Sequence, residues 1–151
     1  REGVMETYYE SGGLEYATDF KDDIIHGIIK GYYESGQLSV EKIYKSGKAE
    51  GMQRVYYENG QLKQEVPYEN DQIEGVLKAY SKTGKLLVEK PYVNGKAHGI
   101  LKRYDKDGGY TEIPFRDGEK EGKGREYDKD GNLTAELIYR DGKLEITTEI
   151  E

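Results

Sequence analysis

The chain has 151 residues, enough for one domain or one array of short repeats. Its 23 basic and 30 acidic residues give a net charge of -7, which argues against nucleic acid or an anionic membrane as the main partner. It contains no cysteine, which excludes disulfides, zinc–thiolate sites and thiol nucleophiles.

Glycine and aromatic residues recur with a fixed period. The opening glycines are 24 residues apart, except for a last step of 23: Gly3, Gly27, Gly51, Gly75, Gly99 and Gly122. A tyrosine stands five residues after each of them: Tyr8, Tyr32, Tyr56, Tyr80, Tyr104 and Tyr127. Such a period indicates a linear repeat array. We therefore predict one array of six repeats, over residues 3–26, 27–50, 51–74, 75–98, 99–121 and 122–145, the fifth being one residue short near Gly109–Thr111.

Each repeat is predicted to form two strands and two turns. The first turns contain Ser11-Gly12, Ser35-Gly36, Asn59-Gly60, Thr83-Gly84, Asp107-Gly108 and Asp130-Gly131, and the second turns include Ser46-Gly47, Asn94-Gly95, Asp117-Gly118 and Asp141-Gly142. These dipeptides between short runs of Tyr, Val and Leu favour hairpins with type I′ turns. The sequence thus predicts an all-β fold, an elongated, twisted antiparallel meander of about 12 or 13 strands.

Charged residues predict the register of the hairpins. A two-residue first turn places a cation directly opposite a glutamate in five repeats: Lys30–Glu41, Arg54–Glu65, Lys78–Glu89, Lys102–Glu112 and Arg125–Glu136. In the first repeat Glu6 faces Ala17, so both charges are lost together. The prolines share one position, just before the late aromatic residue of their repeats: Pro67, Pro91 and Pro114. Because proline cannot donate to a sheet, this position is expected to face solvent or to lie at a bulge.

The two ends of the chain also follow the pattern. Arg1-Glu2-Gly3 is similar to the ends of later second turns, such as Lys120-Glu121-Gly122, so we expect the chain to begin inside a longer array. At the other end, Leu144, Ile146, Thr148 and Ile150 alternate with mostly charged residues. This alternation predicts a last strand, with residues 146–151 capping the sheet.

Several stretches resemble a known repeat family. The run from Tyr92 to Gly99 resembles the core of a MORN repeat, the membrane occupation and recognition nexus motif, as does the run from Phe115 to Gly124. The pattern Tyr32-Tyr33-Glu34-Ser35-Gly36-Gln37-Leu38, followed by Glu41-Lys42-Ile43-Tyr44, is similar to the variant repeat common in bacteria. The resemblance implies a hairpin array. For function it implies an antitoxin-like or exported bacterial protein, and for repeats of the eukaryotic type it implies scaffolding or phospholipid binding.

Catalytic and metal-binding patterns fail their tests of spacing. His26 and His98 occupy equivalent turn positions three repeats apart, about 29 Å in such a sheet, which is too far to share a metal. The acidic runs at Asp105–Gly108 and Asp128–Gly131 lack the spacing of a calcium loop and match turns instead. We therefore expect no enzymatic activity, no metal site and no cofactor.

Differences between repeats suggest where a partner binds. Tyr9, Tyr33 and Tyr57 follow the tyrosine column in the first three repeats only, either as an exposed row or as packing residues. The first repeat is strongly acidic and includes Asp22 and Asp23. We expect a non-catalytic module, antitoxin-like or scaffold, that binds a basic protein through Tyr9, Tyr33, Tyr57, Asp22 and Asp23. The alternatives are an exported or surface-associated bacterial protein that binds host or envelope components and, last, a phospholipid-binding module. The compartment is accordingly the bacterial cytoplasm or the cell surface, and the oligomeric state stays open.

Overall fold

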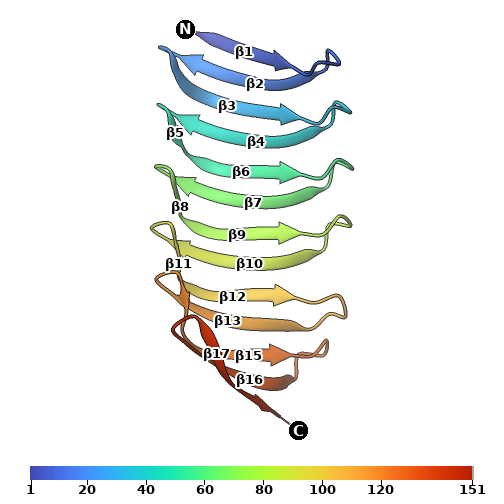
Figure 1. Ribbon diagram of the computed structural model, residues 1–151, viewed down its shortest axis with the longest axis vertical. Coiled ribbons are helices and arrows are strands. Elements are labelled where there is room, and N and C mark those ends of the chain that lie inside the picture. The colour runs from blue at the N-terminus through green and yellow to red at the C-terminus, as the bar shows by residue number, and fades with distance from the viewer. Residues whose placement is uncertain (151) are drawn as a thin grey trace. The chain divides into compact units, whose positions relative to one another are not determined.

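The computed structural model describes residues 1–150, which form strands and turns and contain no helix. It therefore offers no helix within this range that could cross a membrane. The described chain divides into two compact units, one of residues 1–73 and 80–85, the other of residues 74–79 and 86–150. Each unit is an antiparallel meander in which strands pair with their neighbours in chain order (Figure 1). The expected all-β meander is confirmed.

The strands of the first unit run through three hairpins and into a fourth. They are β1 (Gly3–Tyr8), β2 (Leu14–Lys21), β3 (Ile24–Tyr32), β4 (Leu38–Lys45), β5 (Lys48–Ala49), β6 (Gly51–Tyr56), β7 (Leu62–Glu69) and β8 (Gln72–Ile73). Strand β9 (Gly75–Tyr80) contributes to both units. The second unit contains β10 (Leu86–Val93), β11 (Lys96–Ala97), β12 (Gly99–Tyr104), β13 (Tyr110–Arg116), β14 (Glu119–Lys120), β15 (Gly122–Tyr127), β16 (Leu133–Arg140) and β17 (Lys143–Glu149).

The described residues form 17 strands where 12 or 13 were expected, because a bulge detaches four two-residue strands: β5, β8, β11 and β14. Where β4 lies against β5 and β6, four residues (50–53) stand opposite two (42–43). The opening glycine of the repeat, Gly51, has φ 72° there, a value that an L residue rarely adopts. The bulge thus separates β5, β8, β11 and β14 from the strands that follow them, just before the opening glycine, whereas β3 runs unbroken through Gly27.

The proline position lies at this bulge, which confirms one of its two predicted settings. The carbonyl of Pro91 accepts the amide of His98 at 3.1 Å, and the carbonyl of Pro114 accepts the amide of Glu121 at the same distance. In the second repeat, which has no proline, the carbonyl of Ile43 accepts the amide of Glu50. The acceptor is therefore a backbone carbonyl, which every residue type supplies. Proline is tolerated because this bond needs no backbone N–H at the proline position.

The second turns have the predicted type I′ geometry, with positive φ at both central residues, as at Asn94 (51°) and Gly95 (76°). For the first turns this prediction is wrong, because only the glycine has positive φ, for example Gly36 at 84°. There the amide of Gly36 donates to the carbonyl of Tyr33, and the amide of Tyr33 donates to the carbonyl of Gln37. This is a type I turn followed by a glycine bulge.

The short fifth repeat lacks one particular residue. In the other hairpins of this kind the second strand carries an extra residue just after the turn, such as Ser39, which lies between the Tyr32–Leu38 and Gly31–Val40 pairs. The β12–β13 hairpin has no such shift, and Tyr104 pairs directly with Tyr110. The deletion therefore removes the bulge residue and leaves the rest of the register intact.

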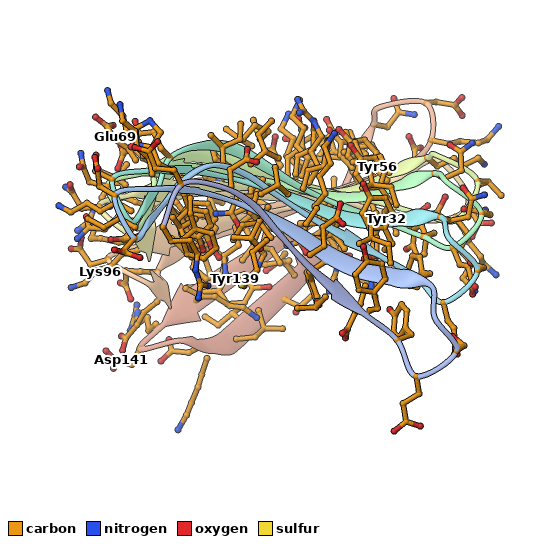
Figure 2. All side chains as sticks on the ribbon, turned by 90° about the horizontal axis from the view of Figure 1, so that it is seen from above. Tyr32, Tyr56, Glu69, Lys96, Tyr139 and Asp141 are labelled. Atoms are coloured by element: carbon orange, nitrogen blue, oxygen red, sulfur yellow. The ribbon has the colours of Figure 1, made fainter. Side chains whose placement is uncertain are left out.

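The main apolar cluster lies in the second unit. Ile113, Leu137 and Tyr139 are buried there, and Leu101 and Phe115 pack against them. The predicted last strand also forms, since β17 pairs with β16 over residues 143–149, while residue 151 of the proposed cap lies outside the described range. Side chains of successive repeats line up along each unit, as Tyr32 and Tyr56 do in the view of Figure 2.

Candidate protein-binding surface

One sheet face of the first unit carries a row of alternating charges. Lys30 pairs with Glu41, Glu41 with Arg54, and Arg54 with Glu65, each directly opposite on the next strand. Glu41 Oε1 lies 4.0 Å from Lys30 Nζ, and Glu65 Oε1 lies 3.2 Å from Arg54 Nε. We call this side of the unit the ladder face. The predicted pairing within hairpins is confirmed here, and the pairing between hairpins is an addition.

The second unit repeats the alternation. Glu89 lies opposite Lys102, which in turn lies opposite Glu112. The ion pairs are Lys78–Glu89 at 3.5 Å and Lys102–Glu112 at 3.3 Å. The pair predicted between Arg125 and Glu136 is opposite in register, but the Glu136 carboxylate contacts Lys123 instead. The cations of this row stand at a fixed distance after the opening glycine of their repeat. This regular placement is the signal in the sequence from which the pairing between hairpins could have been predicted.

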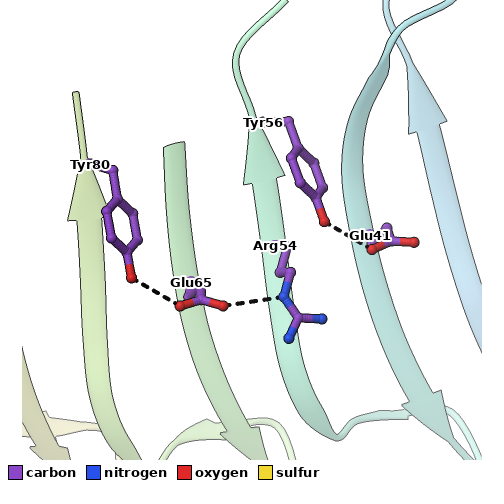
Figure 3. A network of polar contacts seen from close by, with 5 residues as sticks. All are labelled: Glu41, Arg54, Tyr56, Glu65 and Tyr80. Carbon is purple, nitrogen blue, oxygen red and sulfur yellow. Dashed lines mark hydrogen bonds and ion pairs between the residues drawn. The ribbon is translucent and has the colours of Figure 1, made fainter. Parts of the chain in front are cut away.

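Three residues of the tyrosine column join their repeat to the one before it. The hydroxyl of Tyr56 donates to Glu41 Oε2 at 3.1 Å, and that of Tyr80 donates to Glu65 Oε2 at 3.1 Å (Figure 3). Tyr104 donates in the same way to Glu89, at 2.8 Å. Each of these glutamates thus accepts a tyrosine hydroxyl from the next repeat and also pairs with a cation of its own repeat.

These contacts favour the protonated phenol. Burial, followed by the hydrogen bond to Glu41, raises the pKa of Tyr56 above its ordinary value of 10.0. Burial and the bond to Glu89 raise the pKa of Tyr104 likewise. Both tyrosines therefore hold their proton, and keep donating, to a higher pH than an unperturbed tyrosine would.

Apolar side chains flank the charged row on the ladder face. Val4, Ile28 and Met52 each follow an opening glycine and point to the same side as the charged residues. Val4 is 61% exposed and Ile28 is 40% exposed. The ladder face thus presents, across the strands, an apolar row, a charged row and a tyrosine row. This apolar row was not among the sequence predictions, although each of its residues directly follows an opening glycine.

The three tyrosines proposed as a binding row are half-buried, and each has an intramolecular partner. The hydroxyl of Tyr9 donates to the carbonyl of Tyr32, that of Tyr33 to Tyr56, and that of Tyr57 to Tyr80, at 2.6, 2.6 and 2.9 Å. These bonds tie each repeat to the next at the first-turn edge. The three residues therefore have a structural role through their hydroxyls. Their role in partner binding stays a prediction, and only the surfaces of their rings are available for it.

Later repeats replace this tyrosine with a residue that caps its own turn. Asp105 Oδ1 accepts the amides of Asp107 and Gly109, and Ser81 Oγ accepts those of Thr83 and Lys85. Asp128 caps its turn in the same way. Hydrogen bonds from the side chain and backbone of Asn132 lower the pKa of the Asp128 carboxyl from 3.8. The acidic runs that resembled calcium loops are thus turn caps.

The acidic turn proposed for partner recognition is exposed. Asp22 and Asp23 are the central residues of the second turn of the first repeat, with φ 52° and 63°. Asp22 also lines a shallow cavity of about 210 Å³ with Lys21 and His26. Both side chains are exposed, and the Asp23 carboxylate pairs with the N-terminal amino group of Arg1 at 2.5 Å. Their role in partner recognition stays a prediction.

The histidine column contacts the following repeat. His26 Nδ1 accepts the amide of Ser46 at 3.2 Å, just as the equivalent Glu50 accepts the amide of Asn70 at 3.1 Å. His98 Nδ1 lies 3.6 Å from Asp117. Within residues 1–150 no three His, Asp or Glu side chains are grouped as a metal site would require.

A comparison with protein families finds the MORN repeat variant, whose model matches residues 1–22, 25–46, 49–70, 73–94 and 120–141. The five matches begin two residues before the opening glycines, and they leave out the repeat that lacks its bulge residue. No curated protein compared with the chain matches it.

Proposed function

The chain belongs to the MORN repeat variant family, and on this basis we propose that it is a non-catalytic module that binds another protein, of antitoxin-like or scaffold type. The observation that carries the proposal is the composition of the ladder face. Its charges pair with one another, while Val4 and Ile28 stay exposed beside them. Protein interfaces are enriched in aromatic residues such as tyrosine, and a charge that is already paired is less costly to bury than an unpaired one.

A basic protein is the partner best suited to the first repeat. That repeat holds six acidic residues against one lysine, and its turn residues Asp22 and Asp23 are exposed. Opposite charge on a partner would speed the encounter, while apolar and aromatic contacts would set the rate of dissociation. An envelope or host component remains the alternative partner, and a phospholipid is disfavoured by the net charge of -7.

The test uses the full-length protein as bait, followed by reconstitution with the purified candidate partner. Surface plasmon resonance at two salt concentrations should show slower association for Asp22→Lys/Asp23→Lys and a weaker dependence on salt. Ile28→Glu should speed dissociation. Vesicles with and without anionic phospholipid serve as the parallel arm. Saturable binding to vesicles with no binding to a purified protein would contradict the proposal, as would turnover that depends on a residue of this chain.

A further inference from the structure

We infer that the ladder face of the first unit binds a proline-rich segment in the polyproline II conformation, an inference that rests on the proposed protein-binding function. The site consists of the tyrosine column Tyr8, Tyr32, Tyr56 and Tyr80, the charged row beside it, and the apolar row of Val4, Ile28 and Met52. The ligand lies across the strands, along these rows. Its identity follows from three features of the face: spacing, contact chemistry and charge.

The spacing of the tyrosines matches the pitch of polyproline II. One tyrosine occurs per hairpin, so successive rings are two strands apart, about 9.6 Å at the usual spacing of about 4.8 Å. Figure 3 shows Tyr56 and Tyr80 in the same orientation, each with its hydroxyl toward a glutamate of the preceding repeat. A polyproline II helix rises about 3.1 Å per residue with three residues per turn, hence about 9.3 Å per turn. Every third residue of such a ligand would therefore meet an equivalent tyrosine.

The contact chemistry suits proline. Aromatic side chains that line a surface are the usual receptors for prolines in this conformation, because the ligand is stiff and loses little entropy on binding. On the ladder face, the exposed aliphatic side chain of Ile28 lies on the other side of the charged row from Tyr32. A polyproline II segment has no internal hydrogen bonds, so its carbonyls need donors. Arg54 gives one N–H to Glu65 and carries four more, and Lys30 carries three.

The charge of the ladder face predicts that one end of the ligand is basic. Farther along, each glutamate of the row has a cation opposite, but Glu6 has Ala17 opposite. Asp19 points to the same side from the neighbouring strand, where its carboxylate accepts the amide of Ile28 at 2.8 Å. The end of the row at the first repeat is therefore anionic. An arginine or lysine that precedes or follows the prolines would pair there.

The test measures binding of a defined peptide to the full chain by fluorescence polarisation. The probe is a fluorescein-labelled peptide of one arginine followed by four Pro-Pro-Ser triplets. The control peptide replaces each triplet by Gly-Gly-Ser, and a third peptide replaces the arginine by glutamate. We expect saturable binding of the first peptide, no saturation with the glycine peptide, and weaker binding of the glutamate peptide. Glu6→Lys should reverse the preference between the two proline peptides.

Substitutions on the two faces of one hairpin test where the peptide binds. Tyr56→Ala should weaken binding about tenfold, while Tyr56→Phe, which keeps the ring, should bind like the original chain. Tyr68→Ala is the matched control, because Tyr68 pairs with Gly51 on the opposite face of the same hairpin. Ile28→Asp is the second variant, since Ile28 is 40% exposed and its replacement should leave the fold intact. Thermal melts verify that each variant is folded.

The inference is overturned if the proline and glycine peptides bind equally, or if neither saturates. It is also overturned if Tyr68→Ala weakens binding as much as Tyr56→Ala does, or if folded Ile28→Asp binds unchanged. The two proposals fail separately. A reconstituted protein partner that binds the chain without a proline-rich segment, and that the proline peptide does not displace, would leave the proposed function standing and refute this inference. If the proline peptide binds saturably but the full-length bait captures no protein partner, this inference stands and the proposed function is refuted.

Discussion

Tyr80 donates its hydroxyl to Glu65, a residue 15 positions earlier in the chain and in the preceding repeat, at 3.1 Å. The same carboxylate pairs with Arg54 through its other oxygen, at 3.2 Å. One glutamate thus connects the two strands of its own hairpin and the hairpin that follows. This arrangement explains why charge and tyrosine recur together in the repeat.

Removal of this carboxylate should destabilise the first unit. Glu65→Ala leaves Arg54 without its opposite charge and removes the acceptor of Tyr80, so we expect a loss of about 1–2 kcal/mol in the free energy of unfolding. Urea denaturation measures the change. Glu69→Ala, at an exposed position on the same strand, is the control and should change stability by less than about 0.5 kcal/mol. Equal effects of the two substitutions would contradict the role of the ladder.

The protonated tyrosines predict a loss of stability at alkaline pH. Since the pKa of Tyr56 is raised above 10.0, the folded chain holds this proton more tightly than the unfolded chain does. The stabilisation is fully present below pH 10.0 and is lost as pH rises through the folded pKa. Tyr56→Phe has no such proton, so the stability difference between the two chains should narrow above pH 10.0. Unfolding curves at pH 8, 10 and 11 measure this difference, which a constant gap would contradict.

The hydroxyl of Tyr33 should matter for stability. Tyr33→Phe removes the bond to the carbonyl of Tyr56 and should cost about 0.5–1.5 kcal/mol. Hydrogen exchange should quicken first around the turns of the second and third repeats, because neighbours in an array depend on each other. If instead Tyr33→Phe melts like the original chain and Tyr33→Ala weakens only partner binding, the ring serves the interface as the sequence analysis proposed.

Backbone conformation should decide the effect of substitutions at glycine. Gly60 has φ 82° and no atom within 4 Å of the place where a Cβ would stand, so Gly60→Val should cost more than about 1 kcal/mol through its backbone alone. Gly13 is the control. It has no positive φ, and the nearest atom to an added Cβ is 3.8 Å away, so Gly13→Ala should be neutral or slightly stabilising. Thermal melts of both variants test this prediction, and an equal loss for both would refute it.

The hairpins and their register could be predicted from the 24-residue period, the turn residues and the placement of the charges. These features depend on residues close in the chain, because a turn fixes the pairing of the strands that it joins. The pairing of Arg54 with Glu65 is an example. The same reasoning erred at the first turns, since a Ser-Gly or Asn-Gly pair fits both a type I′ turn and a type I turn with a glycine bulge.

Contacts between repeats were decided by the tertiary structure. The sequence places Tyr33 and Tyr57 at equivalent positions but does not say that their hydroxyls reach a carbonyl 23 residues later. It also gave no sign that Glu41 would accept the hydroxyl of Tyr56. Such bonds join residues of different hairpins, and their partners depend on how far each side chain reaches across two strands. Pairing within a hairpin can be predicted from a local sequence pattern. The distances between residues of different hairpins are set only when one hairpin packs beside the next.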